Sequence, residues 1–218
     1  MCGIIGIIGK QDVADRLVEG LRRMEYRGYD SAGVCTVRDG QLIRRRAEGK
    51  LNNLVTKLAQ NPAPGVVGIA HTRWATHGAP TTSNAHPHAT DEVALVHNGI
   101  IENYAALKEA LINKGHQFTS DTDTEVLVHF IQDVMEETGM GLFDSVRTAL
   151  TEVVGAYAIV LFDRRFPDQL VCAKKSSPLV IGVGADGEYY IASDATPFIE
   201  YTKNAVYLED EEVALLER

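Results

Sequence analysis

The chain has 218 residues, of which 45% are hydrophobic, and its formal net charge is −9 at pH 7. This length can bury one sizeable core, and because no linker, repeat or low-complexity tract divides it, we expect a single domain over residues 1–218. The acidic balance argues against nucleic acid as a partner, and the absence of an apolar stretch of roughly 20 residues argues against a membrane partner.

The first predicted element is a buried strand over residues 3–9, and the residue in front of it is Cys2. Removal of Met1 would leave a thiol and a free α-amine on this one residue. An α-amine titrates near about 8, so at neutral pH a useful fraction can accept the thiol proton without a histidine. Cys2 is therefore a candidate nucleophile, although its position alone also fits a frayed terminus or a small core residue.

The other two cysteines, Cys35 and Cys172, lie inside strand-like apolar runs, where we expect them in the core. Three cysteines form an odd number without the spacing of a disulfide framework. Together with the lack of a secretion leader, this favours a cytoplasmic protein.

Apolar residues at helical spacing predict five helices, over residues 13–24, 51–58, 103–115, 122–134 and 142–153. Thr122 and Glu125 have the spacing of a capping box at the start of the fourth helix. Strand-like runs occupy residues 3–9, 32–37, 41–47, 66–71, 93–97, 155–162, 169–173, 179–183, 188–192, 205–208 and 212–216.

Turn signals at Asp39-Gly40 and Asp186-Gly187 predict hairpins between neighbouring strands. Many short strands joined by hairpins, with the helices grouped, indicate antiparallel sheets covered by helices. We therefore expect an α+β layered sandwich. The basic run at residues 44–46 is expected to be a solvated strand edge rather than a docking patch.

A cluster of polar and aromatic residues follows the strand at 66–71. Residues 71–78 contain one arginine, one tryptophan, two threonines and two histidines. At the rim of a sheet, Arg73 could bind a carboxylate with both arms of its guanidinium, and Trp74 could close over a small substrate. The alternative is that Arg73 is a surface charge and Trp74 a core anchor.

Histidine is concentrated in the same region, because five of the seven histidines lie between residues 71 and 97. His86 and His88 would share one strand face, so a zinc site has to be considered. No HExxH or CxxC pattern accompanies them. We therefore expect neither a metal nor another cofactor.

Asn98-Gly99 follows the strand at 93–97, and this dipeptide is usually a tight hairpin turn. The chain turns into a helix only a few residues later, which leaves room for no more than a short return strand. An asparagine amide beside an unhindered glycine N–H instead offers two donors for one oxyanion. Asp123 could either complement its helix dipole or receive a substrate ammonium.

Together these groups imply acyl transfer from a free amino acid. With residues 2–4, 71–78 and 97–99 and Asp123, the sequence resembles the class II glutamine amidotransferases over essentially its whole length. The resemblance implies the N-terminal-nucleophile hydrolase fold, a four-layer αββα sandwich of antiparallel sheets.

The resemblance also implies a mechanism for L-glutamine. Cys2 attacks the side-chain amide, its α-amine carries the proton, and Asn98 with Gly99 holds the oxyanion of the reaction. A glutamyl thioester forms, ammonia leaves, and water releases glutamate. The remaining family positions are Arg73 for the α-carboxylate, Asp123 for the α-ammonium, Trp74, Thr76 and His77 in a loop that closes over glutamine, and Arg27 and His86 in supporting roles.

Residues 21–33 and 71–78 are most similar to the branch of that family whose members use fructose-6-phosphate as the acceptor. The resemblance then implies a sugar-phosphate isomerase domain as partner, which we expect to be absent from this chain, and a possible homodimer of the full-length enzyme. Two alternatives stay open: an amidase of the phosphoribosylamine-forming type, and a non-enzymatic binding domain or histidine metal site.

Overall fold

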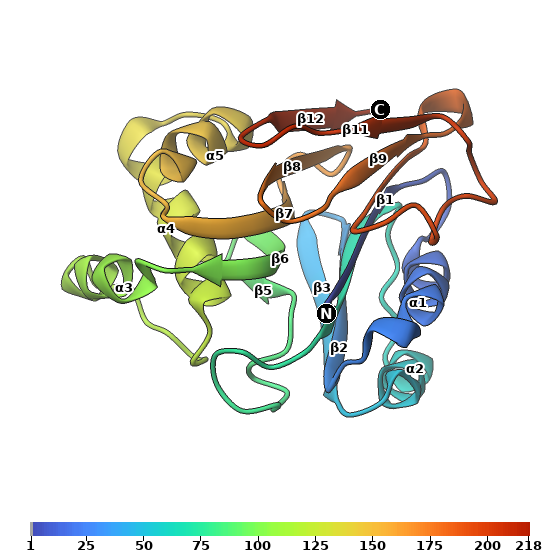
Figure 1. Ribbon diagram of the computed structural model, residues 1–218, viewed down its shortest axis with the longest axis horizontal. Helices are drawn as coiled ribbons and strands as arrows, with labels where there is room; N and C mark the ends of the chain where they lie inside the picture. Colours follow the sequence, from blue (N-terminus) through green and yellow to red (C-terminus); the bar gives the residue numbers. More distant parts are fainter. Residues whose placement is uncertain (1) are drawn as a thin grey trace.

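The computed structural model describes residues 2–218, which form two sheets packed face to face with helices on both outer faces (Figure 1). One sheet contains β1 (Gly3–Ile8), β2 (Ser31–Arg38), β3 (Gln41–Glu48), β4 (Val67–Arg73), β9 (Val180–Val183), β10 (Tyr189–Ala192) and β11 (Ala205–Tyr207). The other contains β5 (His88–Ala89), β6 (Val93–Ile101), β7 (Gly155–Asp163), β8 (Gln169–Lys175) and β12 (Val213–Glu217).

The helices divide between the two sheets. Two of them cover the first sheet: α1 (Ala14–Arg23) and α2 (Leu51–Gln60). Three accompany the second sheet: α3 (Tyr104–Asn113), α4 (Asp123–Thr138) and α5 (Leu142–Leu150). Two short 3-10 helices complete the described chain: η1 (Glu25–Arg27) and η2 (Ala185–Gly187). Within residues 2–218, every helix is too short or too polar to traverse a lipid bilayer.

The strand order explains why the start of the chain lies deep in the molecule. The first sheet runs β11-β9-β10-β1-β4-β2-β3 and the second runs β12-β8-β7-β6-β5, with antiparallel pairing between neighbours. β1 is therefore flanked on both sides, and Gly3 pairs with Thr72 at the end of β4. This register places Cys2 beside the segment that follows β4.

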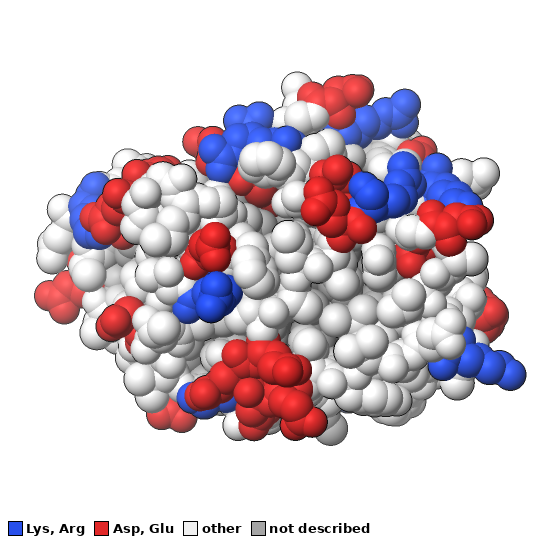
Figure 2. Space-filling view, turned by 90° about the horizontal axis from the view of Figure 1, so that it is seen from above, with Lys and Arg blue, Asp and Glu red and all other residues white. Residues whose placement is uncertain are grey.

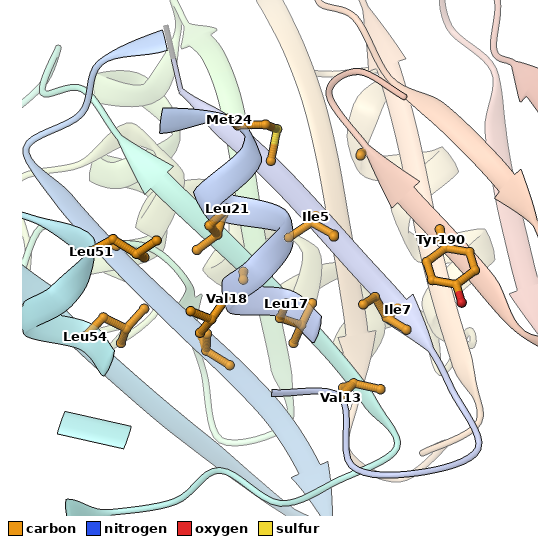
Figure 3. Close-up of a cluster of buried hydrophobic side chains, with 14 of the residues drawn as sticks. Ile5, Ile7, Val13, Leu17, Val18, Leu21, Met24, Leu51, Leu54 and Tyr190 are labelled. Carbon is orange, nitrogen blue, oxygen red and sulfur yellow. The ribbon is translucent and has the colours of Figure 1, made fainter. Parts of the chain in front are cut away.

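β1 shows how alternation builds the layers. Ile5 and Ile7 point to the helix side, where they pack in one cluster with Leu17 and Leu21 of α1 (Figure 3). Ile4 and Ile8 point the other way, into the core shared with strands of the second sheet. The αββα sandwich predicted from the sequence is thus confirmed, because one face of each sheet packs on helices and the other on the opposite sheet.

Most predicted elements occur within a few residues of their expected bounds, including both hairpins. Asp39 and Gly40 both have positive φ, at 53° and 70°, as the tight turn between β2 and β3 requires. Asp186 and Gly187 also have positive φ, within the slightly longer connection from β9 to β10. Thr122 caps α4 by accepting a hydrogen bond from the Glu125 N–H over 3.2 Å, as its spacing predicts.

The predicted end of one strand is wrong. The strand expected at residues 93–97 continues as β6 through Asn98-Gly99 to Ile101, and it pairs with β7 throughout. Ile100 and Ile101 are therefore part of the same strand and not a return strand. The sequence does not predict β5, because this strand consists of only two residues, both of which pair with β6.

Cys35 and Cys172 are fully buried in the core between the sheets, as predicted. The basic run at residues 44–46 lies on the edge strand β3, but its description as solvated needs correction. Arg46 donates to the carbonyl oxygens of Ser83 and Ala85, so it holds a loop in place. On the face shown in Figure 2, basic side chains lie beside acidic ones and form no continuous patch, and acidic side chains gather in one broad cluster.

Candidate active site

The candidate residues meet in a cavity of about 290 Å³ near the end of β1 that carries Cys2, where strands of both sheets come together. Every candidate residue except His77 lines this cavity: Cys2, Arg27, Arg73, Trp74, Thr76, His86, Asn98, Gly99 and Asp123. The structure therefore brings together the residue in front of β1, the end of η1, the end of β4 and the loop that follows it, the outer part of β6, and the start of α4. Their individual roles remain predictions.

Cys2 is held from several directions. Its Sγ accepts a hydrogen bond from the backbone N–H of Trp74 over 3.1 Å. Its carbonyl oxygen accepts bonds from the Asn98 amide at 3.1 Å and from the Arg27 guanidinium at 3.2 Å. Burial raises the pKa of the Cys2 thiol, although the Trp74 N–H and the charge of Arg73 act in the opposite direction. The thiol consequently needs a base before it can attack.

Asn98 and Gly99 lie on the part of β6 that extends beyond the short strand β5. The N–H groups of a strand alternate between its two sides, and two of those on the side away from β7 have known partners. The His97 N–H faces the His86 ring nitrogen at 3.4 Å, and the Ile101 N–H donates to Asp123 at 2.8 Å. The Gly99 N–H lies between them on the same side, where Gly99 lines the cavity.

Only glycine fits at position 99. Gly99 has a φ of 120°, and a Cβ there would lie 2.1 Å from the carbonyl oxygen of Ala156 on β7. The sequence indicates only that the N–H of this glycine is unhindered. The structure shows in addition that the neighbouring strand leaves no room for a side chain.

Arg73 and Asp123 place opposite charges on the cavity wall. Arg73 is only 3% exposed, so it is not the surface charge that the alternative interpretation required. Its guanidinium donates to two carbonyl oxygens of the following loop. One belongs to His77, and the other belongs to Ala79 at 3.2 Å. Asp123 is 4% exposed and accepts from the Ile101 N–H. A small ligand that carries one negative and one positive charge would match this pair.

The loop after Arg73 forms the rim. Trp74 is 55% exposed, so it is not a core anchor, and Thr76 lines the cavity. His77 packs edge-on against Tyr104, and its Nδ1 lies 4.0 Å from Asp123. In this structure His77 therefore lies beside the Asp123 carboxylate and outside the cavity wall.

The buried histidines form a scaffold around the site. The rings of His71 and His86 stack at 4.1 Å, and His86 meets His88 edge-on at 5.0 Å. His88 bonds to Thr122 and His97 to Thr124, so both support the first turn of α4 that carries Asp123. Burial lowers the pKa of His71 to about 3, and it lowers the pKa values of His86 and His88 well below their usual range. In residues 2–218, no three or more His, Cys, Asp or Glu side chains are arranged to hold a metal ion.

Several residues at the site are not predicted from the sequence. Ser177 and Pro178, between β8 and β9, also line the cavity. Arg27 reaches Cys2 because Asp194, from the other end of the chain, binds its guanidinium at 2.7 Å. Asp30 anchors the rim by accepting from the Ala75 N–H at 2.8 Å. These contacts depend on the tertiary arrangement and not on local pattern.

Comparisons with known sequences agree with this site. Residues 71–200 match the family model described as a glutamine amidotransferase domain. The chain is 53% identical over 218 residues to the glutamine–fructose-6-phosphate aminotransferase (isomerizing) of Zymomonas mobilis, and 52% identical over 221 residues to that of Bacteroides thetaiotaomicron. Each alignment covers 100% of this chain and 36% of the relative, so the chain spans about a third of the length of these curated relatives.

Solved structures show the same architecture. The glutamine phosphoribosylpyrophosphate amidotransferase from B. subtilis, complexed with ADP and GMP, superposes with a TM-score of 0.82 at 28% identity, covering 99% of this chain and 47% of that chain. A glutamine aminotransferase class-II domain protein from Silicibacter pomeroyi has a TM-score of 0.65 at 12% identity, covering 99% and 95% of the two chains, and supports the fold alone.

Proposed function

Because the chain belongs to the glutamine amidotransferase domain family, we propose that it hydrolyses L-glutamine to glutamate and ammonia with Cys2 as the nucleophile. The observation that carries this proposal is the composition of one cavity, which contains a thiol, an amide donor and an Arg73–Asp123 pair of opposite charge. L-Glutamine presents an α-carboxylate, an α-ammonium and a side-chain amide, and each finds a complementary group there.

The reaction begins after removal of Met1, when the α-amine of Cys2 accepts the thiol proton. Sγ then bonds to the amide carbon of glutamine, and the oxygen that becomes negative is held by the Asn98 amide and the Gly99 N–H. As the carbon–nitrogen bond breaks, the α-ammonium of Cys2 returns the proton to the leaving ammonia. Water attacks the resulting glutamyl thioester, which releases glutamate and restores the thiol.

The amine is a better base here than any neighbouring imidazole. In the described part of the chain, the Cys2 Sγ bonds to the backbone of Trp74 rather than to a histidine. Nε2 of His71 is hydrogen-bonded to Asn98, and Nδ1 of His97 to Thr124. An α-amine with a pKa near about 8 is close to the optimum for a general base at neutral pH.

The acceptor half of the reaction belongs to a longer enzyme. We propose that this chain is the single glutaminase domain of such an enzyme, and that its ammonia serves glucosamine-6-phosphate synthesis from fructose-6-phosphate on a sugar-phosphate isomerase domain. The names of relatives at 53% and 52% identity support this acceptor over phosphoribosylpyrophosphate, whose amidotransferase is 28% identical. A cytoplasmic location and a homodimer of the full-length enzyme belong to the same proposal, and three free cysteines suit a reducing compartment.

The test uses the 218-residue chain after intact mass has confirmed that it begins at Cys2. It is incubated with glutamine, with and without fructose-6-phosphate, while glutamate, ammonia and glucosamine-6-phosphate are assayed together. We expect equal glutamate and ammonia, and no amino sugar. Absence of glutamate would defeat the glutaminase proposal, whereas stoichiometric glucosamine-6-phosphate would show that this chain also holds the acceptor site.

A further inference from the structure

A buried histidine outside the proposed reaction contacts the proposed oxyanion donor. His71 lies on β4 and is completely inaccessible to solvent. Its Nε2 lies 2.8 Å from Oδ1 of Asn98, which belongs to β6 in the other sheet. Asn98 in turn donates through Nδ2 to the carbonyl oxygen of Cys2 over 3.1 Å. The three residues form a chain of hydrogen bonds from one sheet to the other.

The direction of each bond follows from the chemistry of its partner. The Cys2 carbonyl oxygen can only accept, so the NH₂ end of the Asn98 amide must face it. Oδ1 of Asn98 therefore faces His71 and requires a donor. Burial lowers the pKa of His71 to about 3, which leaves a neutral ring with one N–H. That hydrogen is on Nε2, because Nε2 is the ring nitrogen that faces Oδ1 and an amide oxygen can only accept.

We propose that His71 is a positioning residue that locks the Asn98 amide in the orientation needed to stabilise the oxyanion. This inference rests on the proposed glutaminase function. An amide can rotate by half a turn and exchange its oxygen and its nitrogen at little steric cost. Rotation here would aim Oδ1 at the developing negative charge, and the His71 Nε2–H opposes it by holding Oδ1 on the far side.

The ring of His71 is itself fixed. It stacks on His86 with the two ring planes only 15° apart, and β4 is paired on both sides at this position, with Ile4 of β1 and Gly33 of β2 opposite His71. Gly33 lets the segment that carries His86 approach β2, because a Cβ there would lie 2.0 Å from the carbonyl oxygen of His86. A rigid donor of this kind can hold a catalytic amide to a narrow range of angles.

The first test compares His71→Leu with His71→Gln in the processed chain. Leucine fills much of the ring's volume but has no N–H, whereas the glutamine amide can still donate to Asn98. Loss of an oxyanion donor typically costs about 100-fold to 1,000-fold in kcat, so losing only its orientation in His71→Leu should cost about 10-fold to 100-fold. We expect KM for glutamine to change less than about threefold, and His71→Gln to recover most of the loss. Unchanged kcat in a folded His71→Leu protein would overturn the proposal.

A second measurement separates positioning from a general loss of structure. If His71 acts through Asn98, then adding His71→Leu to Asn98→Ala should lower kcat no further, whereas independent effects would multiply and contradict the proposal. Nitrogen NMR of the unmodified protein should show a neutral Nε2–H ring for His71 between about pH 5 and 8, and an Nδ1–H ring would overturn it. Failure of the wild-type chain to release glutamate would instead defeat the proposed function, and the NMR result would still decide the His71–Asn98 bond.

Discussion

The side-chain amide of Asn98 donates a hydrogen bond to the backbone carbonyl oxygen of Cys2 over 3.1 Å. The two residues are 96 positions apart in sequence, and Cys2 precedes β1 of one sheet whereas Asn98 lies on β6 of the other, so the contact exists only after the sandwich has assembled. It joins the proposed oxyanion donor directly to the proposed nucleophile. The second hydrogen of the same NH₂ group remains for the oxyanion of the reaction.

Asn98→Ala should lower kcat for glutamine hydrolysis by about 100-fold to 1,000-fold while KM changes little, because the lost donor acts mainly in the transition state. Steady-state kinetics with glutamate detection would measure both constants. Asn113→Ala, on the exposed end of α3, is the matched control and should behave like wild type. A raised KM with unchanged kcat would assign Asn98 to substrate binding instead.

Asp123→Asn should raise KM for glutamine by about 10-fold to 100-fold, since a hydrogen bond to a charged group is worth about 1.5–3 kcal/mol. The amide keeps the shape of the carboxylate but loses the charge that would pair with the α-ammonium. The control is Asp144→Asn on α5, whose side chain is 61% exposed and remote from the cavity. An analogue of glutamine that lacks the α-amino group should bind the wild-type protein and Asp123→Asn equally. If the wild-type protein still bound this analogue more tightly than Asp123→Asn, the proposed pairing with the α-ammonium would be refuted.

Arg73→Lys should also raise KM, by at least about tenfold, although the positive charge is kept. Lysine cannot reproduce the planar fork, which in this structure also binds the carbonyl oxygens of His77 and Ala79. The loop would then become less ordered, which limited proteolysis of the two proteins would detect. Wild-type kinetics in Arg73→Lys would show that neither the fork nor the loop contacts matter for glutamine.

Much of the fold follows from local pattern. β1 is recognisable because an uninterrupted run of isoleucines and glycines suits a strand that is buried on both faces. The turn at Asp39-Gly40 is recognisable because few other residue pairs adopt positive φ twice in succession. The end of β6 was not recognisable from its sequence. Asn-Gly ordinarily turns the chain, but pairing with β7 from Val93 to Ile101 outweighs that preference.

The site divides in the same way. The polar residues at 71–78 and 97–99 stood out because they follow or interrupt apolar strands. The contribution of Ser177 and Pro178 could not be foreseen, since their place depends on how β8 and β9 straddle the two sheets. Nor could the partner of His71, because a buried histidine has the same sequence signature whether it supports a catalytic amide or only fills the core.

An electrophilic glutamine analogue should label Cys2 and leave Cys35 and Cys172 unmodified. Burial raises the pKa of each of the latter two thiols to about 12, so they are neutral at working pH and closed to solvent. Peptide mapping by mass spectrometry would locate the label. A folded variant that retains Met1 should react slowly, because its Cys2 has no free α-amine, and a label on Cys35 or Cys172 would refute the assignment.

Stability should fall as the solution is acidified below about pH 6.5, before most carboxylates titrate. The unfolded chain binds protons on its histidines near this pH, whereas burial keeps His71, with a pKa of about 3, and also His86 and His88 neutral in the folded chain. Their contribution is therefore fully present above about pH 6.5 and is lost as the pH falls towards the folded pKa values. Well below pH 6.5, each histidine contributes a limiting slope of about 1.4 kcal/mol per pH unit. Urea unfolding at several pH values between about 7.5 and 5 would measure the total slope, and His71→Gln should reduce it by one histidine's share. A stability that stays constant over this range would show that the buried histidines accept protons without unfolding the chain.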